Sequence, residues 1–152
     1  SLGSQRFQTF WTKIEPSFNG RRLAIIGSEC PQNFSCLKDN YICDFISNAK
    51  DCLRKAKSLG FEVSTSLSYY YDLIILELTK SQKTNLGLIS LADEYIQNGG
   101  AMIVNGDNQI GVKSFLKKLS DYWTEEITVI RKKGRIAFYK KKKHYLYHGK
   151  NI

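Results

Sequence analysis

The sequence predicts a doubly wound α/β fold, in which a mostly parallel sheet carries helices on both faces and ends in an antiparallel hairpin. Short, continuously apolar runs such as RRLAIIG (21–27) and AMIVNG (101–106) alternate with amphipathic segments of helical period. Continuous apolar runs are typical of strands buried on both faces, and their alternation with helices indicates right-handed crossovers. Two further β-rich runs flank residues 132–134 and predict the hairpin.

Two helices and four strands are predicted before residue 80. Phe7, Phe10, Trp11 and Ile14 recur at helical spacing and indicate an amphipathic first helix that ends near Pro16. The predicted helices are residues 5–15 and 47–60, the predicted strands are residues 21–27, 41–46, 61–65 and 69–78, and residues 29–40 form a predicted loop.

Two helices, one strand and the hairpin are predicted after residue 80. One helix carries an apolar stripe over residues 88–96 and ends at Asn98-Gly99-Gly100. The other has Asp107 or Asn108 as its N-cap and an apolar stripe over residues 112–123. The predicted strands are residues 101–106, 126–131 and 135–140.

The chain has the size of one domain. With 152 residues, 42% of them apolar, it can bury one ordinary core, so we expect a single α/β domain over residues 1–139, followed by a basic tail or linker over residues 140–152. No window approaches the roughly 18 apolar residues of a membrane span, and the first residues lack a signal-peptide pattern. A cytoplasmic protein without a membrane partner is expected.

Cysteine and histidine placement argues against a metal site. The four cysteines are Cys30, Cys36, Cys43 and Cys52. Their spacing, C-x5-C-x6-C-x8-C, matches neither paired zinc knuckles nor a CxxC redox site. Both histidines lie after residue 143. Reduced thiols and no bound metal are expected.

The net charge of +9 is concentrated at one end of the chain. Nine of the 23 basic residues and none of the 14 acidic ones lie in residues 131–152. Basic residues interleaved with aromatic ones suit an RNA phosphate backbone, whose binding is driven by counterion release; a solvated tail, an acidic protein partner or an anionic membrane surface is the alternative. The candidate RNA-contacting residues are Arg131, Lys132, Lys133, Arg135, Lys140, Lys141, Lys142 and Lys143.

The order of elements resembles the class I S-adenosylmethionine-dependent methyltransferase fold. Its members carry D-x-G-x-G-x-G after the first strand, so that the backbone can approach the cofactor. In LAIIGSECP the pattern places Ile25 at the acid, Gly27 at the first glycine, and Glu29 and Pro31 at the next two. The resemblance therefore implies a degenerate cofactor site, in which Gly27 is vestigial and Asp44 is the nearest candidate for holding a ribose.

The strand over residues 69–78 lacks the catalytic motif of the amino-methylating members. In those enzymes the strand ends in N-P-P-[YF], and the Asn side chain and a proline carbonyl orient the target amine. The same positions here are occupied by Glu77, Leu78, Thr79 and Lys80. The resemblance thus implies no catalytic residue in this chain and makes Glu77 a vestigial position.

Loss of both motifs resembles one domain in particular, the N-terminal half of the ribosomal RNA small subunit methyltransferase C family. The likeness is best over residues 70–139, in YDLIILELTKS, NGGAMIVNGDNQIGVKSFLKKL and GRIAFY, and before residue 60 it rests mainly on RRLAIIGSECPQN. These proteins pair two methyltransferase-like domains, and only the C-terminal one binds S-adenosylmethionine and methylates a guanine N2 of 16S rRNA.

The resemblance implies a non-catalytic domain that assists rRNA binding or braces a catalytic domain of the same polypeptide. S-adenosylmethionine would bind in that catalytic domain, and no cofactor is expected in this chain. Two alternatives stay open, so that the sequence does not decide whether the chain is an enzyme. One is a complete small S-adenosylmethionine-dependent methyltransferase with Asp44 at the ribose and Glu77 near the acceptor; the other is a stand-alone basic adaptor that recruits RNA.

Overall fold

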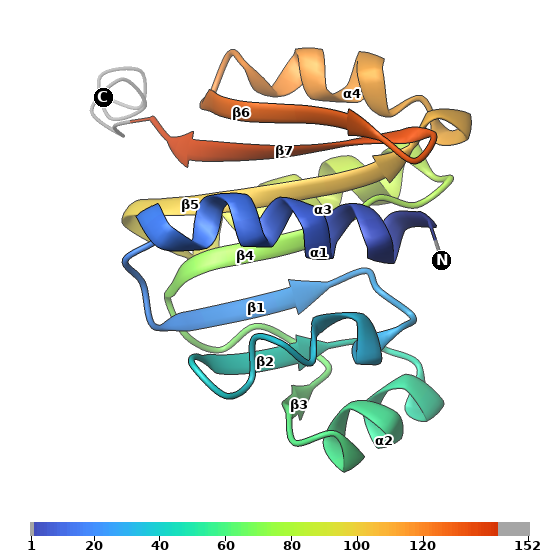
Figure 1. The fold of residues 1–152 in the computed structure, drawn as a ribbon, viewed down its shortest axis with the longest axis vertical. Coiled ribbons are helices and arrows are strands. Elements are labelled where there is room, and N and C mark those ends of the chain that lie inside the picture. The colour runs from blue at the N-terminus through green and yellow to red at the C-terminus, as the bar shows by residue number, and fades with distance from the viewer. Residues whose placement is uncertain (1, 143–152) are drawn as a thin grey trace.

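The computed structural model describes residues 2–142, with side chains from residue 5 onward, and contains a seven-stranded sheet of order β3-β2-β1-β4-β5-β7-β6 (Figure 1). Strands β1 to β5 pair in parallel, whereas β7 pairs antiparallel with both β5 and β6. This confirms the predicted sheet and hairpin. The strands are β1 (Arg22–Ile26), β2 (Ile42–Ile46), β3 (Glu62–Ser64), β4 (Tyr71–Glu77), β5 (Ile96–Asp107), β6 (Trp123–Arg131) and β7 (Gly134–Lys141).

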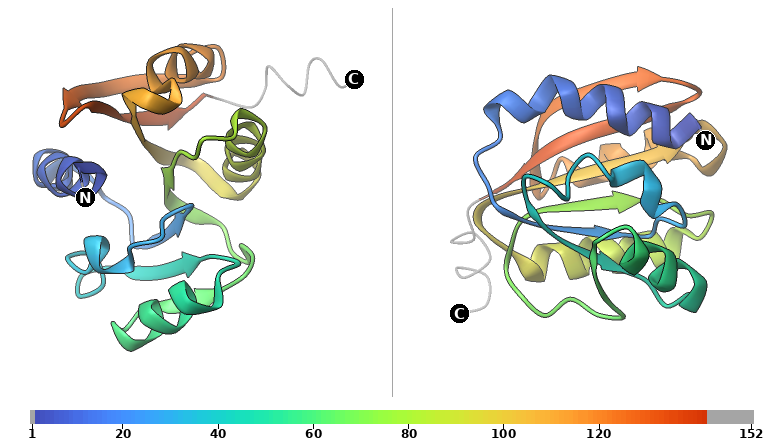
Figure 2. Two further views of the ribbon diagram at one scale, coloured as in Figure 1. Left: turned by 90° about the vertical axis from the view of Figure 1, so that its right-hand side faces the viewer. Right: turned by 60° about the horizontal axis from the view of Figure 1, so that its bottom comes forward.

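Helices cover both faces of the sheet. The N-terminal helix and the segment between β1 and β2 lie on one face, and the third and fourth helices lie on the other (Figure 2). No helix in the described part of the chain is long and apolar enough to cross a membrane. The α-helices are α1 (Leu2–Ile14), α2 (Lys50–Ser58), α3 (Gln82–Tyr95) and α4 (Val112–Leu119), and the 3₁₀ helices are η1 (Glu15–Ser17), η2 (Pro31–Phe34) and η3 (Asn108–Ile110).

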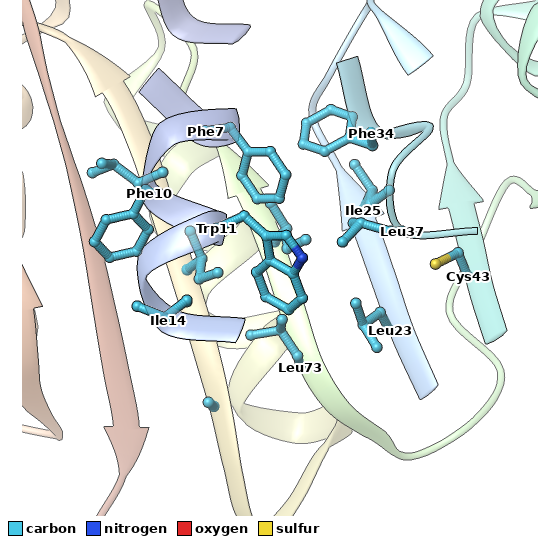
Figure 3. Close-up of a cluster of buried hydrophobic side chains, with 14 of the residues drawn as sticks. Phe7, Phe10, Trp11, Ile14, Leu23, Ile25, Phe34, Leu37, Cys43 and Leu73 are labelled. Carbon is cyan, nitrogen blue, oxygen red and sulfur yellow. The ribbon is translucent and has the colours of Figure 1, made fainter. Parts of the chain in front are cut away.

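Helix α1 is anchored across the sheet by its aromatic stripe. Phe7, Phe10, Trp11 and Ile14 are all at most 3% exposed, and they pack on β-strand side chains such as Leu73 (Figure 3). Burial of each such side chain contributes about 1.5–3 kcal/mol. The predicted helix is confirmed, and its anchoring fixes where its polar residues lie.

The crossover from β1 to β2 contains no α-helix in the described chain. Parallel strands are usually joined through a helix, but here η2 and irregular turns connect them, as the predicted loop over residues 29–40 implied. Phe34 and Leu37 are fully buried and attach this segment to the core. This segment therefore packs against the hydrophobic core on one face of the sheet and does not form a helix that begins at the sheet edge.

Several predicted element ends in the second half are wrong. Strand β5 begins at Ile96, and the register shift between Tyr71 and Leu73 of β4 absorbs the extra residues 97–100, so Gly99 and Gly100 lie in a bulge and do not cap α3. Helix α4 begins only at Val112, after η3, and ends at Leu119. The glycine residues gave a helix-cap signal, but pairing of β5 with β4 determines their conformation instead.

The hairpin turn is shorter than predicted. Arg131 pairs with Gly134, which leaves Lys132 and Lys133 as a two-residue loop, both with left-handed φ (50° and 56°). Gly134 thus belongs to β7. Strand β7 continues to Lys141, one residue past the predicted strand, so the predicted domain boundary after residue 139 falls inside β7.

Candidate functional site

The candidate site is the carboxyl edge of the sheet, on the right in Figure 1, where β1, β4 and β5 end beside the β6–β7 turn and the start of α1. The order 3-2-1-4-5 places the topological switch point between β1 and β4, which is where open α/β sheets bind ligands. Glu77 at the end of β4 pairs with Asn105 of β5. The edge therefore contains the predicted vestigial position Glu77 together with polar groups from three other segments.

Arg6 of α1 is the central residue of this edge. Its side chain is only 1% exposed, and its Nε donates to Asn105 Oδ1 at 2.8 Å. Its Nη2 lies 2.5 Å from Asp107 Oδ1, and its Nη1 donates to the carbonyl oxygens of Arg131 and Lys132 at 3.2 and 2.6 Å. A buried guanidinium that is both paired and hydrogen-bonded on every nitrogen is a stable arrangement.

Glu77 completes the network. Asn105 Nδ2 donates to Glu77 Oε1 at 3.3 Å. Desolvation of the Glu77 carboxyl group raises its pKa to about 8, although the hydrogen bond from Asn105 and the charge of Arg6 act in the opposite direction. Desolvation therefore favours the neutral form of this carboxyl group. We define the Arg6 network as Arg6, Glu77, Asn105 and Asp107.

Gly27 directly follows β1 and has a left-handed φ of 88°. A Cβ at this position would lie 2.5 Å from the carbonyl oxygen of Glu77, so the ends of β1 and β4 approach each other closely. Ser28 follows and is buried, and its Oγ accepts a hydrogen bond from the backbone amide of Cys30. The glycine is thus required by local packing, and the residues after it turn into η2 instead of presenting a glycine-rich cradle.

The loop after β4 is held by one buried side chain. Asn85 of α3 is fully buried; its Nδ2 donates to the carbonyl oxygen of Thr79, and its Oδ1 accepts the Thr79 amide at 2.8 Å. The Thr79 hydroxyl also donates to Asn85 Oδ1. The Asn85 side chain therefore fixes the backbone of Thr79, at a position where the methyltransferase motif has a proline. We call this pair of hydrogen bonds the Asn85 clamp; the sequence did not predict it.

Asp44 lies in the middle of β2, not at the strand end where a ribose-binding acid is expected. Its carboxylate is 2.6 Å from the hydroxyl of Tyr71, which donates to it, and 3.7 Å from Arg22 Nη2. The residue is 5% exposed. The structure thus separates Asp44 from Gly27 and Glu77 and gives it partners within the sheet.

The predicted basic cluster is divided between the two ends of β7. Arg131, Lys132 and Lys133 are exposed at the carboxyl edge, with Arg135 half-buried beside them. Lys140, Lys141 and Lys142 lie at the other end, about 24 Å away for an eight-residue strand. Lys143 lies outside the described residues.

Two of the distal lysines are committed to backbone carbonyls. Lys141 Nζ donates to the carbonyl oxygens of Asp93 and Ile96 at 2.6 and 2.8 Å, and Lys142 Nζ donates to that of Ser120 at 2.7 Å. These contacts satisfy helix C-termini, because the last carbonyls of a helix have no partners within it. Lys141 and Lys142 therefore donate to the backbone of the protein itself, and their contact with RNA stays a prediction.

Sequence reasoning also missed Arg6. The residue precedes Phe10 and Ile14 by four and eight positions and so shares their helical stripe. A basic residue on a core-facing stripe was the available signal.

Comparison with known proteins identifies structures that share this fold. No family model matches the chain, and no curated protein matches it. Among solved structures, the N-methyltransferase NodS from Bradyrhizobium japonicum superposes with a TM-score of 0.75 at 12% identity, covering 93% of this chain and 97% of that one. The ribosomal protein L11 methylase from Lactobacillus delbrueckii gives 0.74 at 12% identity, with 91% and 80% covered.

A third structure matches only in part of its length. The 16S rRNA N2 G1207 methyltransferase of T. thermophilus, solved in complex with AdoMet and guanosine, gives a TM-score of 0.74 at 17% identity, and 82% of this chain is covered. This chain covers 36% of that protein, or about a third of its length. At these identities the likeness concerns architecture, and it shows that the chain has the class I S-adenosylmethionine-dependent methyltransferase fold.

Proposed function

We propose that this chain is a non-catalytic methyltransferase-like domain that assists rRNA binding or braces a catalytic methyltransferase domain of the same polypeptide. The observation that carries the proposal is the Arg6 network, which occupies the carboxyl edge of β4 and β5 with groups that bind one another. An amine-methylating site at this edge needs an amide oxygen that is available to the target amine. Asn105 Oδ1 accepts Arg6 instead, and Glu77 stands where the catalytic Asn would be.

The residues around β1 and β2 do not fit S-adenosylmethionine. The donor needs close backbone approach after β1 and an acid at the end of β2 for its ribose. After β1, Gly27 is the one glycine at the positions where the family pattern has three. The carboxylate of Asp44 contacts Tyr71 and Arg22. In this proposal the donor binds in another domain of a longer protein, which is consistent with the 36% coverage of the T. thermophilus enzyme.

The RNA part of the proposal rests on charge and position. Arg131, Lys132 and Lys133 are exposed at the carboxyl edge, and the T. thermophilus neighbour with the same fold is named for its action on 16S rRNA. Cytoplasmic location, where the rRNA is, belongs to the same proposal. Contacts to phosphate without base reading are expected, since the basic residues follow no base-recognition motif.

Titration calorimetry with S-adenosylmethionine and with S-adenosylhomocysteine tests the absence of a donor site. We expect no heat of binding at millimolar ligand, whereas the T. thermophilus methyltransferase, measured alongside, binds. Micromolar affinity for either ligand would refute the proposal. Binding that is lost together with methylation in Glu77→Ala would favour the complete small enzyme.

A further inference from the structure

The β6–β7 turn has an unusual sequence for its backbone. A two-residue hairpin loop with positive φ at both positions is a type I′ turn, for which Asn-Gly is strongly preferred. Lys132 and Lys133 occupy these positions here, with φ of 50° and 56°. Left-handed backbone at a non-glycine residue is strained and persists only where the surroundings impose it. The turn therefore retains two charged side chains at a conformational cost.

The body of the domain imposes this conformation. Arg6 Nη1 donates to the carbonyl oxygens of Arg131 and Lys132, and the Asn108 amide donates to that of Lys133 at 2.9 Å. Three consecutive carbonyl groups of the turn thus face inward. The side chains of the same three residues are exposed. The turn is preorganised, which lowers the ordering entropy that a binding partner must offset.

The surroundings leave the positive charge of the turn uncompensated. Asp107 is half-exposed, but Arg6 at 2.5 Å neutralises it. Desolvation raises the pKa of the nearby Glu77 carboxyl group and so disfavours its negatively charged form. In contrast, Lys141 and Lys142 at the far end of β7 are bound to carbonyl oxygens. At the carboxyl edge the exposed basic side chains are thus those of Arg131, Lys132 and Lys133, while Lys140 is exposed at the other end of β7.

We propose, on the basis of the proposed rRNA-binding function, that the Lys132–Lys133 turn is the element that contacts RNA phosphates and that Arg6 is the positioning residue that holds it out. In this proposal the carboxyl edge of the sheet, where open α/β sheets bind ligands, holds the cationic β6–β7 turn in place through the Arg6 network. Its contacts are sequence-independent, since ammonium groups meet phosphate as point charges.

The double variant Lys132→Asn/Lys133→Gly tests the proposal without endangering the fold, because Asn-Gly suits a type I′ turn better than Lys-Lys. Affinity for a 16S rRNA transcript and for labelled poly(U) is measured over a range of salt concentrations. Loss of two phosphate contacts is expected to reduce the slope of log affinity against log salt by about 1.4 for the single strand. The matched control is Lys117→Gln/Lys118→Gln on exposed α4 positions, which removes equal charge and should leave the slope near the wild-type value.

Arg6→Lys separates positioning from stability. It retains the charge but cannot reach Asn105, Asp107 and two carbonyl groups together. If Arg6 acts through the turn, Arg6→Lys lowers RNA affinity in the wild-type background and adds nothing in the Asn-Gly background. An additive effect would overturn the positioning role.

The outcomes distinguish the two proposals. If the wild-type chain binds neither RNA, the RNA part of the proposed function and the turn both fail. If it binds with a steep salt dependence that the Asn-Gly variant retains, or if the α4 control flattens the slope equally, the turn is refuted and the proposed function stands.

Discussion

Gly134 lies directly beneath the guanidinium group of Arg6. A Cβ on Gly134 would be 2.3 Å from Arg6 Cζ and 2.5 Å from the carbonyl oxygen of Gly106. Gly134→Ala is therefore expected to lower the free energy of unfolding by about 1–3 kcal/mol through overpacking, as measured by urea denaturation. Displacement of Arg6 from its partners would add to this loss.

Gly87→Ala provides the matched control. Gly87 lies within α3, and a Cβ there meets nothing within 4 Å. Alanine in a helix interior should stabilise the protein by about 0.5–1 kcal/mol. If Gly134→Ala were as well tolerated as Gly87→Ala, Arg6 would not pack as described.

The sheet could be predicted because its strands are continuously apolar. Residues 23–26 and 101–106 are buried on both faces, so their continuous apolar runs differ from the spaced apolar positions of the amphipathic helices. The ends of β5 and α4 could not be predicted, because Gly-Gly and Asx residues give the same local signal in a cap and in a bulge. Pairing with β4 places Gly99 and Gly100 in a bulge, and pairing with Gly134 of β7 keeps Asp107 in β5.

The candidate site could be predicted only as a set of missing motifs. Gly27 and Glu77 were placed correctly at the edge, since they directly follow or end apolar runs. The partners of Arg6 lie 99 to 126 residues away in the sequence, and helical periodicity does not reveal them. Similarly, composition shows that residues 131–152 are basic, but it does not show that Lys141 and Lys142 donate to backbone carbonyl groups.

The desolvated carboxyl group of Glu77 predicts a pH-dependent stability. Its pKa is about 8 in the folded protein and near 4.5 when exposed, so between these values the folded state holds one more proton than the unfolded state. Stability from this group is complete below the lower pKa and falls as pH rises toward 8. Glu77→Gln removes this dependence.

The measurement is the difference in free energy of unfolding between Glu77→Gln and wild type, from urea titrations between about pH 5 and pH 8. Taking the difference cancels the other titrating groups. The variant should gain steadily on the wild type with rising pH. A difference that stays constant would mean that the carboxyl group is not desolvated.

The clamp between Asn85 and Thr79 predicts a local effect. Asn85→Ala leaves the amide and carbonyl of Thr79 without their partner and should cost about 1–3 kcal/mol. It should also speed hydrogen exchange at the Thr79 amide. Asn98→Ala, at an exposed position of β5, is the control and should change stability by less than about 0.5 kcal/mol. Slow exchange at Thr79 in Asn85→Ala would show that the loop does not depend on the clamp.

The position of Lys141 predicts that a residue of the basic cluster contributes to stability and not to RNA affinity. The side chain is 7% exposed, and its two carbonyl partners lie at the C-terminal end of α3. Lys141→Met keeps the length of the side chain but removes its donors, which should cost about 1–3 kcal/mol. The salt dependence of RNA binding should stay at the wild-type slope, because Nζ is committed to the protein backbone. Lys140→Met, at the exposed neighbouring position, should leave stability within about 0.5 kcal/mol of wild type; a flatter salt slope in Lys141→Met would return Lys141 to the RNA-binding surface.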